Sequence, residues 1–373
     1  MSDKPTLNVC LIGQKFMGRT HSNAYLKVDK FFDLPMKPVM HTICARDEAE
    51  LKAFADQWGW QHTDTDWKSA IAQDDIDLVD IGTPNHVHKE PAIAALEAGK
   101  HVACEKPLAG TLEDAKAMME AAQANPKCKT FVWYNYRRVP AVALAYQLAR
   151  EGRLGRIYHV RASYLQDWGG PDQGMTWRFK KETAGSGAHG DLNAHIIDMA
   201  RFITGEEIED VKGALAPTFI KQRKKDDGTM DDNTVDDALL FIGTLTGGGI
   251  CSFEASRVAT GNQNRNGIEI NGEKGSIKFD FEDMNHLYYY DATQPRKVQG
   301  WTQIMATHGE THPYVGNWWP DAHILGYEHG FINEAADIVN VIAGQAPVVP
   351  LPDFEDAYKT QLVLDKAAKA AGV

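Results

Sequence analysis

The stretch Leu7-Asn8-Val9-Cys10-Leu11-Ile12-Gly13-Gln14-Lys15-Phe16-Met17-Gly18 decides the fold of the first part of the chain. Its first half is mostly apolar and typical of a buried strand, and helical periodicity begins at Met17. In the pattern G-x-G-x-x-G, the first glycine makes a tight turn and the third lets the helix pack on the strand. Gly13 and Gly18 fill these two positions, and Lys15 takes the second. The stretch therefore predicts a dinucleotide-binding strand-turn-helix unit.

The same alternation of strands and helices continues over the first third of the chain. Further strands are expected at 39–44, 76–81, 101–104 and 130–133, and helices at 17–27, 48–58, 90–98 and 112–124. Apolar strands that alternate with amphipathic helices are typical of a parallel sheet built from βαβ units. We expect an α/β Rossmann domain with a parallel sheet over residues 1–133.

Short strand-like segments dominate the rest of the chain. They are expected at 157–164, 211–215, 238–244, 250–255, 268–271, 276–280 and 287–290, with helices at 141–150, 192–204, 327–342 and 354–371. Glycine-rich turns at 247–249 and 271–272 indicate hairpins between neighbouring strands. Residues 134–373 are therefore expected to form an α+β domain with a large, mainly antiparallel open sheet that binds substrate and forms oligomers.

Composition and charge exclude several classes of function. The chain has 373 residues and a formal net charge of −12, so nucleic acid is not an expected partner. No apolar run is long enough to span a bilayer, and the N-terminus lacks a secretory signal pattern. Five scattered cysteines without a CxxC pair are typical of reduced thiols rather than of a metal site or a disulfide framework. We expect a cytoplasmic protein without a metal, in which the basic cluster 221–225 is a solvated loop.

The residues after the second strand bear on the choice of cofactor. An acid at this place usually accepts hydrogen bonds from the ribose hydroxyls of NAD. Here the sequence has Ala45 and Arg46 instead. Arg46 would hold the 2′-phosphate of NADP, or it would stack on adenine or stay in solvent, and the residue pattern leaves these alternatives open.

Two motifs follow later strands of the predicted parallel sheet. Gly82-Thr83-Pro84-Asn85-His86 offers small and amide-bearing groups that suit a nicotinamide, and Cys104-Glu105-Lys106-Pro107 ends the strand at 101–104. The carboxyl ends of parallel strands face the crevice where ligands bind. Lys106 is therefore a candidate catalytic residue.

A third motif lies in the second domain, where the sequence from Asp191 to Asp198 is expected to be helical. Asp191, His195 and Asp198 would share one face of that helix, because residues three and four apart are neighbours. A histidine oriented by carboxylates is suited to general-base catalysis. The alternative is structural, since Asp191 is also a good helix N-cap.

Together these motifs resemble the glucose-fructose oxidoreductase / inositol dehydrogenase / MocA family over essentially the whole chain. The combination of Glu105-Lys106-Pro107 with Asp191 and His195 carries the resemblance. Within the family, residues 16–25, 135–138, 164–168 and 177–179 resemble the levoglucosan dehydrogenase branch, which oxidises the C3 hydroxyl of a pyranose ring. Lys15 departs from the family pattern, in which a small residue is common.

The resemblance implies a role for each candidate residue. Lys106 would hydrogen-bond the reacting hydroxyl, His195 would take its proton, and Asp191 would hold the sugar or orient the histidine. The implied cofactor-binding residues are Gly13, Lys15, Phe16, Met17, Gly18, Ala45, Arg46, Thr83, Pro84, Asn85, His88, Glu105 and Lys106. The implied substrate-binding residues are Lys106, Asn135, Arg137, Tyr164, Gln166, Asp167, Trp168, Arg178, Asp191 and His195.

The expected activity is the NAD-dependent oxidation of a pyranose, an anhydrosugar or a glycoside, with NADP as a second possible cofactor and a homodimer or homotetramer as the assembly. Three alternatives stay open. One is an NAD-dependent glycosidase that oxidises C3 transiently, and another is an inositol or polyol dehydrogenase. The third is a non-catalytic sugar or nucleotide sensor, against which the presence of Lys106, Asp191 and His195 argues.

Overall fold

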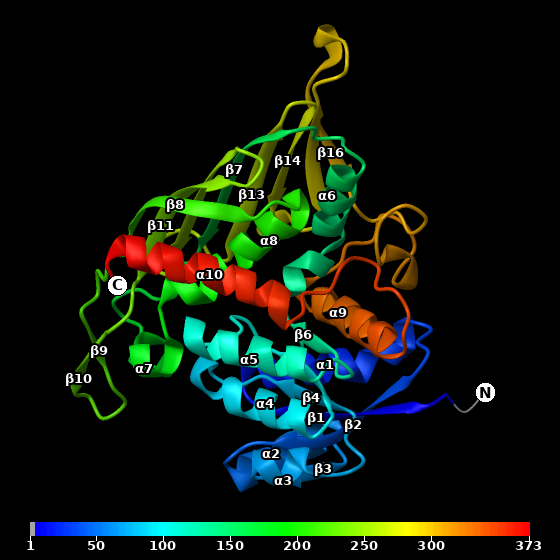
Figure 1. Ribbon diagram of the computed structural model, residues 1–373, viewed down its shortest axis with the longest axis vertical. Coiled ribbons are helices and arrows are strands. Elements are labelled where there is room, and N and C mark those ends of the chain that lie inside the picture. Colours follow the sequence, from blue (N-terminus) through cyan, green and yellow to red (C-terminus); the bar gives the residue numbers. More distant parts are fainter. Residues whose placement is uncertain (1–3) are drawn as a thin grey trace. The chain divides into compact units, whose positions relative to one another are not determined.

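The computed structural model describes residues 4–373, which divide into two compact units (Figure 1). The N-terminal unit combines residues 4–138 with 326–358. The C-terminal unit combines residues 139–325 with 359–373. Among residues 4–373, no helix has both the length and the apolar character that a membrane span requires.

The N-terminal unit is built on a six-stranded sheet in the order β3-β2-β1-β4-β5-β6, and every neighbouring pair is parallel. Its strands are β1 (Thr6–Ile12), β2 (Lys37–Cys44), β3 (His62–Asp64), β4 (Leu78–Ile81), β5 (His101–Cys104) and β6 (Thr130–Val132). The helices between them are α1 (Phe16–Phe31), α2 (Glu48–Trp58), α3 (Trp67–Ile71), α4 (Lys89–Glu97) and α5 (Leu112–Ala124). Side chains on both faces of β1 are buried, as parallel sheets require. The predicted Rossmann fold is confirmed.

A segment from the far end of the chain completes this unit. Helix α9 (Tyr327–Ile342) carries Phe331, whose ring centroid lies 6.0 Å from that of Trp133 and 6.0 Å from that of His21. Arg138 and Asp337 also meet at 3.4 Å with both side chains fully buried. The expected boundary at residue 133 divides the chain once, whereas each compact unit combines two separate segments of the chain. The assignment of substrate binding and oligomerisation to residues 134–373 stays a prediction.

The C-terminal unit is built on an eight-stranded sheet in the order β16-β15-β14-β13-β7-β12-β11-β8. Only the pair β7 and β12 is parallel among the pairings described, so the prediction of a mainly antiparallel sheet is confirmed. The strands are β7 (Ile157–Leu165), β8 (Ile208–Leu215), β11 (Ala238–Leu245), β12 (Ile250–Ser256), β13 (Arg265–Gly272), β14 (Gly275–Asp280), β15 (His286–Asp291) and β16 (Trp301–Met305).

Within residues 4–373, α6 (Pro140–Arg150) and α8 (Ala194–Thr204) pack on the same face of this sheet, and the opposite face is not covered by a helix. Helix α8 contacts β7 and β13, and α6 contacts β14 and β15 (Figure 1). On the opposite face, Leu240 and Ile242 of β11 are 40% and 56% exposed, whereas the alternating residues Leu239 and Phe241 are buried. This face forms an apolar hollow of about 980 Å³ that also includes Leu215 and Trp301.

A separate hairpin pairs β9 (Gln222–Lys224) with β10 (Met230–Asp232). The expectation of a solvated loop at 221–225 is wrong for this segment. Lys221 and Lys224 are exposed as expected, but strand alternation turns Arg223 inward, where its side chain is fully buried. The burial is possible because backbone carbonyls and a carboxylate surround the guanidinium.

Candidate active site

The turn after β1 has the geometry that a dinucleotide requires. Gly13 has φ of 121°, and a Cβ at this residue would lie 2.7 Å from the carbonyl oxygen of Gly82. A Cβ on Gly18 would lie 2.3 Å from the carbonyl oxygen of Gly13. Both positions therefore exclude a side chain. The first turn of α1 contains no acidic residue and no side chain caps it, which fits a pyrophosphate at its N-terminus.

The lysine in the second glycine position is paired with an acid that the sequence pattern did not single out. The carboxylate oxygen Oε2 of Glu50 lies 2.5 Å from Nζ of Lys15 and 3.0 Å from Nε2 of Gln14. Glu50 belongs to the first turn of α2, which Asp47 caps through its side chain. Arg46 is exposed at the end of β2. The structure therefore provides an acid beside the turn, although it is five residues beyond Ala45.

The loops after β4 and β5 are tied together by His88. Its ring is fully buried, with Nε2 2.9 Å from the carbonyl oxygen of Thr83 and Nδ1 3.2 Å from that of Leu108. Burial lowers the pKa of His88. The Lys106–Pro107 bond between these loops is cis, and the Lys106 side chain is half-buried. Thr83, Asn85 and Lys106 thus come from two loops that His88 holds together.

Asp191 and His195 lie on a distorted helix rather than a regular one. Residues His189–Asn193 form a π-helical turn that runs directly into α8. Asp236 fixes the start of this turn, because its carboxylate accepts hydrogen bonds from the backbone N–H groups of Gly187 and His189. No side chain caps either helical segment, so Asp191 is not an N-cap. Such turns occur frequently at functional sites.

Asp191 is paired with a buried arginine. Arg257 donates from one terminal nitrogen to Oδ2 of Asp191 at 3.1 Å and from the other to the carbonyl oxygen of Arg178 at 3.1 Å. Its guanidinium also lies 5.3 Å from the ring centroid of Trp168. The Arg257 side chain is 2% exposed and that of Asp191 is 27% exposed. Arg257 thus contacts three of the predicted substrate-binding residues.

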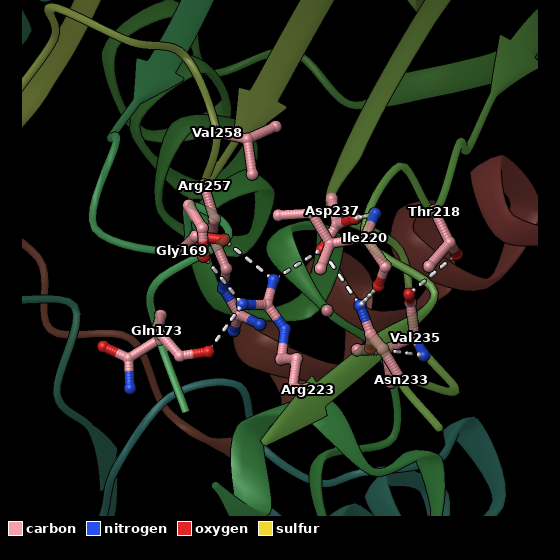
Figure 2. Close-up of polar contacts among 12 residues, drawn as sticks. Gly169, Gln173, Thr218, Ile220, Arg223, Asn233, Val235, Asp237, Arg257 and Val258 are labelled. Atoms are coloured by element: carbon pink, nitrogen blue, oxygen red, sulfur yellow. Dashed lines mark hydrogen bonds and ion pairs between the residues drawn. The ribbon is translucent and has the colours of Figure 1, made fainter. Parts of the chain in front are cut away.

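A second buried arginine braces the loop that carries Trp168. Figure 2 shows Arg223 of the β9–β10 hairpin between Gly169, Gln173 and Asp237. Its guanidinium also lies 3.7 Å from the ring centroid of Phe179. The hairpin therefore holds the backbone at Gly169 and Gln173 and packs on the ring of Phe179.

A chain of side-chain hydrogen bonds joins other predicted sugar contacts. The amide oxygen of Asn264 accepts from the Tyr164 hydroxyl at 2.8 Å and from the Gln166 amide at 2.7 Å, and Gln166 accepts from the Trp168 indole at 2.6 Å. The Tyr164 ring centroid lies 5.8 Å from that of His195. The structure thus links Tyr164, Gln166 and Trp168 through a residue, Asn264, that sequence reasoning missed, and places His195 beside Tyr164.

The remaining predicted sugar contacts lie elsewhere. Asn135 and Arg137 belong to the N-terminal unit, where both are buried and Arg137 pairs with Asp356 at 2.5 Å. Asp167 accepts a hydrogen bond from the backbone N–H of Gly261, and Arg178 stacks on Trp177. Among residues 4–373, no group of three or more histidine, cysteine, aspartate and glutamate side chains is arranged to hold a metal ion.

Comparisons with known proteins agree with this geometry. A family model described as "Oxidoreductase family, NAD-binding Rossmann fold" matches residues 7–134, and one described as "GFO/IDH/MocA C-terminal domain" matches residues 142–278. The levoglucosan dehydrogenase of Pseudarthrobacter phenanthrenivorans is 39% identical over 98% of this chain and 96% of its own length.

Solved structures give the same result over nearly the whole chain. The crystal structure of an oxidoreductase domain protein from Kribbella flavida is 47% identical, with a TM-score of 0.95 over 99% of this chain and 97% of the other. A levoglucosan dehydrogenase in complex with NADH and levoglucosan is 40% identical, with a TM-score of 0.93 over 98% of this chain and 97% of the other. The chain therefore belongs to the glucose-fructose oxidoreductase / inositol dehydrogenase / MocA family and is an oxidoreductase with an NAD-binding Rossmann domain.

Proposed function

We propose that this enzyme oxidises the C3 hydroxyl of a pyranose sugar, an anhydrosugar or a glycoside. NAD, when bound, supplies the hydride acceptor. The observation that carries the proposal is the full-length likeness to a levoglucosan dehydrogenase solved with both NADH and levoglucosan. The resemblance of the sequence motifs to that branch supports oxidation at C3.

The N-terminal unit supplies the group that polarises the reacting hydroxyl. Lys106 lies directly after β5 and Glu105, on the loop that His88 joins to Thr83. Its ammonium donates a hydrogen bond to the hydroxyl oxygen and stabilises the negative charge that develops there. Gly13, Gly18 and the first turn of α1 would hold the pyrophosphate, and Thr83 and Asn85 would line the nicotinamide.

The C-terminal unit supplies the proton acceptor. His195 takes the hydroxyl proton as a general base, and Tyr164 packs beside its ring. Asp191, held by Arg257, accepts a hydrogen bond from a sugar hydroxyl. Tyr164, Gln166 and Trp168 present a linked row of polar groups and aromatic rings. Such a surface suits a sugar ring, which has apolar faces and a rim of hydroxyls.

A panel of sugars with NAD tests the proposal. Levoglucosan, glucose, a nitrophenyl glucoside and myo-inositol would each be incubated with the enzyme while reduced-nicotinamide absorbance is recorded. We expect NADH to accumulate with a pyranose or anhydrosugar. Release of nitrophenol without net NADH would instead identify a redox-neutral glycosidase, and turnover of myo-inositol alone would identify a polyol dehydrogenase. Absence of all turnover, with sugar binding retained, would identify a sensor.

We also infer that the enzyme is a homodimer or homotetramer and acts in the cytoplasm. The uncovered apolar face of the eight-stranded sheet supports self-association, because its exposed Leu240, Ile242 and Leu215 side chains would be removed from water in an interface. The five cysteines are free thiols, and four of them are buried, which supports a reducing compartment.

A further inference from the structure

His21, Asp80 and Glu105 form a buried cluster of ionisable groups, and the proposed reaction does not use His21 or Asp80. His21 in α1 is fully buried between two carboxylates. Its Nδ1 lies 3.0 Å from Oδ2 of Asp80 at the β4 side, and its Nε2 lies 3.0 Å from Oε1 of Glu105. One imidazole therefore contacts two acids in a place that water does not reach.

This geometry requires a charged ring. A neutral imidazole carries a single N–H, so its second nitrogen would present a lone pair to a carboxylate. An imidazolium instead donates a hydrogen bond from Nε2 to Glu105 and forms an ion pair through Nδ1 with Asp80. Burial by itself lowers the pKa of His21, but the two carboxylates outweigh it and raise the pKa to about 10.

Aromatic and titratable groups surround the two acids. The His21 ring stacks on Trp133, with centroids 4.3 Å apart, and the Trp133 indole donates to Asp80 at 2.9 Å. Cys104 and His88 interact with these carboxylates. Tyr25 and Glu334 interact with them as well. Burial raises the pKa of both, to about 8 for Glu334, so both are neutral at pH 7.

Two arginines near Glu334 also pair with other carboxylates. Arg137 pairs with Asp356, and Arg138 pairs with Asp337. His21 contacts both Asp80 and Glu105.

Glu105 connects His21 to the candidate catalytic lysine. While Oε1 contacts His21, Oε2 accepts a hydrogen bond from the backbone N–H of Lys106 at 3.2 Å. The Glu105 side chain is almost completely buried, so it has no alternative partner in solvent. The position of the Lys106 backbone therefore depends on a carboxylate whose own position depends on His21.

We propose that His21 is a buried imidazolium that fixes Glu105 and, through it, the position of Lys106, so that His21 and Glu105 are positioning residues of the dehydrogenase. The role in catalysis rests on the proposed function of Lys106. It gives Glu105 a purpose other than direct contact with the cofactor.

The charge on His21 can be measured without any activity. Protein labelled with ¹⁵N in histidine would be studied by NMR at pH 8, with His21→Gln used to assign the signal. We expect both ring nitrogens of His21 to be protonated while His88 remains neutral. A neutral His21 ring at pH 8 would overturn the proposal.

Kinetics test the positioning role. His21→Gln should lower kcat by about tenfold to a hundredfold, the scale for a misplaced catalytic group, with the Kd for NADH unchanged. The same substitution made in Lys106→Ala should have no further effect on kcat. If His21→Gln lowers kcat by the same factor in the wild-type enzyme and in Lys106→Ala, His21 does not act through Lys106. A wild-type kcat in the His21→Gln variant would also contradict the positioning role.

Two further variants keep the test sound. His41→Gln is the matched control, because His41 is a buried histidine that contacts Asp75 at 3.1 Å in the same unit, and it should leave kcat unchanged. If His21→Gln does not fold, the double variant His21→Gln/Asp80→Asn is used instead in the comparison with Lys106→Ala. It removes one buried carboxylate charge together with the charge of His21. If His21 is charged but the protein oxidises no sugar, the proposed function and the positioning role are both refuted. The conclusion that His21 is a buried imidazolium would still hold.

Discussion

The guanidinium of Arg257 donates a hydrogen bond to the carboxylate of Asp191 at 3.1 Å, and the arginine is buried whereas the aspartate is partly exposed. A carboxylate held by a guanidinium is a good hydrogen-bond acceptor and a poor proton acceptor. The pair therefore supports the proposal that His195 takes the proton and that Asp191 binds the sugar.

Removal of the arginine should impair sugar binding and turnover. Arg257→Met leaves Asp191 without its partner, and we expect kcat/KM for the sugar to fall about tenfold to a hundredfold, mainly through KM. Arg257→Lys should recover part of the loss, because it keeps a positive charge in place. Arg265→Met is the control, since Arg265 also pairs with an aspartate but is half exposed. If Arg257→Met has the same kcat/KM as the wild type, Asp191 does not need Arg257 to bind the sugar, and the proposed role of the pair is wrong.

Lys106→Ala should abolish most of the activity without loss of cofactor. The lysine acts on charge that develops during the reaction, so we expect a loss of about a hundredfold or more in kcat/KM. The Kd for NADH and the melting temperature should stay close to wild type. Steady-state kinetics with fluorescence titration of NADH measure both quantities, and near-normal turnover would remove Lys106 from the mechanism.

The Rossmann half of the fold could be predicted because both faces of its sheet are covered, which makes each strand a continuous apolar run. The β9–β10 hairpin could not be predicted in this way. Its residues are almost all polar, and nothing in the local sequence distinguishes the buried Arg223 from its exposed neighbours Lys221 and Lys224. The carbonyls that accept its hydrogen bonds belong to residues 169–173, about fifty positions earlier.

The candidate site was predicted only in part for a related reason. Asp191 and His195 could be identified from their spacing, but the π-helical turn at 189–193 depends on Asp236, which follows 43 residues or more later. Asn264 reaches Tyr164 and Gln166 through the register of β13 on β7. Residues that meet through strand pairing across a hundred positions leave no local pattern.

Cofactor choice should favour NAD over NADP. Glu50 is held at the phosphate-binding turn by Lys15 and Gln14, and its charge would repel a 2′-phosphate. We expect Arg46→Ala to weaken both cofactors alike, because the guanidinium stacks rather than pairs. If Arg46 holds a 2′-phosphate instead, the loss would be selective for NADP and amount to roughly 1.5–3 kcal/mol.

A second substitution checks the same account from the other side. Glu50→Gln should lower the Kd for NADP and leave that for NAD little changed. Binding titrations with the two oxidised cofactors measure this. A wild-type Kd lower for NADP than for NAD would refute the assignment.

Glu334→Gln should stabilise the protein at alkaline pH. Burial raises the pKa of Glu334 to about 8, and neither carboxyl oxygen has a hydrogen-bond partner within residues 4–373. The pKa of Glu334 is higher in the folded than in the unfolded state. Its contribution to the free energy of unfolding is therefore fully present below about pH 4.5 and is lost as the pH rises toward 8. The amide does not ionise, so the variant should gain roughly 1–3 kcal/mol over wild type at pH 9.

Denaturant unfolding at pH 5 and pH 9 measures the effect. The two proteins should differ little at pH 5, where the glutamate is largely neutral in the folded state. A stability difference that does not change with pH would show that Glu334 ionises normally.

Ile242→Asp should dissociate the predicted oligomer. Ile242 is 56% exposed on the uncovered face of the sheet, and a charge there would be buried without a partner in any interface. We expect light scattering to give the monomer mass for this variant and a dimer or tetramer for wild type. Glu254→Gln removes a charge from the neighbouring strand β12 and serves as the control. A monomeric wild type would refute the assembly.

The central claim is oxidation at C3 with NAD, and isotope transfer tests it most directly. The enzyme would be incubated with NAD and levoglucosan deuterated only at C3, and the reduced cofactor would be isolated and analysed by mass spectrometry. We predict one deuterium in each molecule of reduced cofactor and a slower rate than with unlabelled sugar. Reduced cofactor that contains no deuterium would contradict the account, because the hydride would then have come from another carbon.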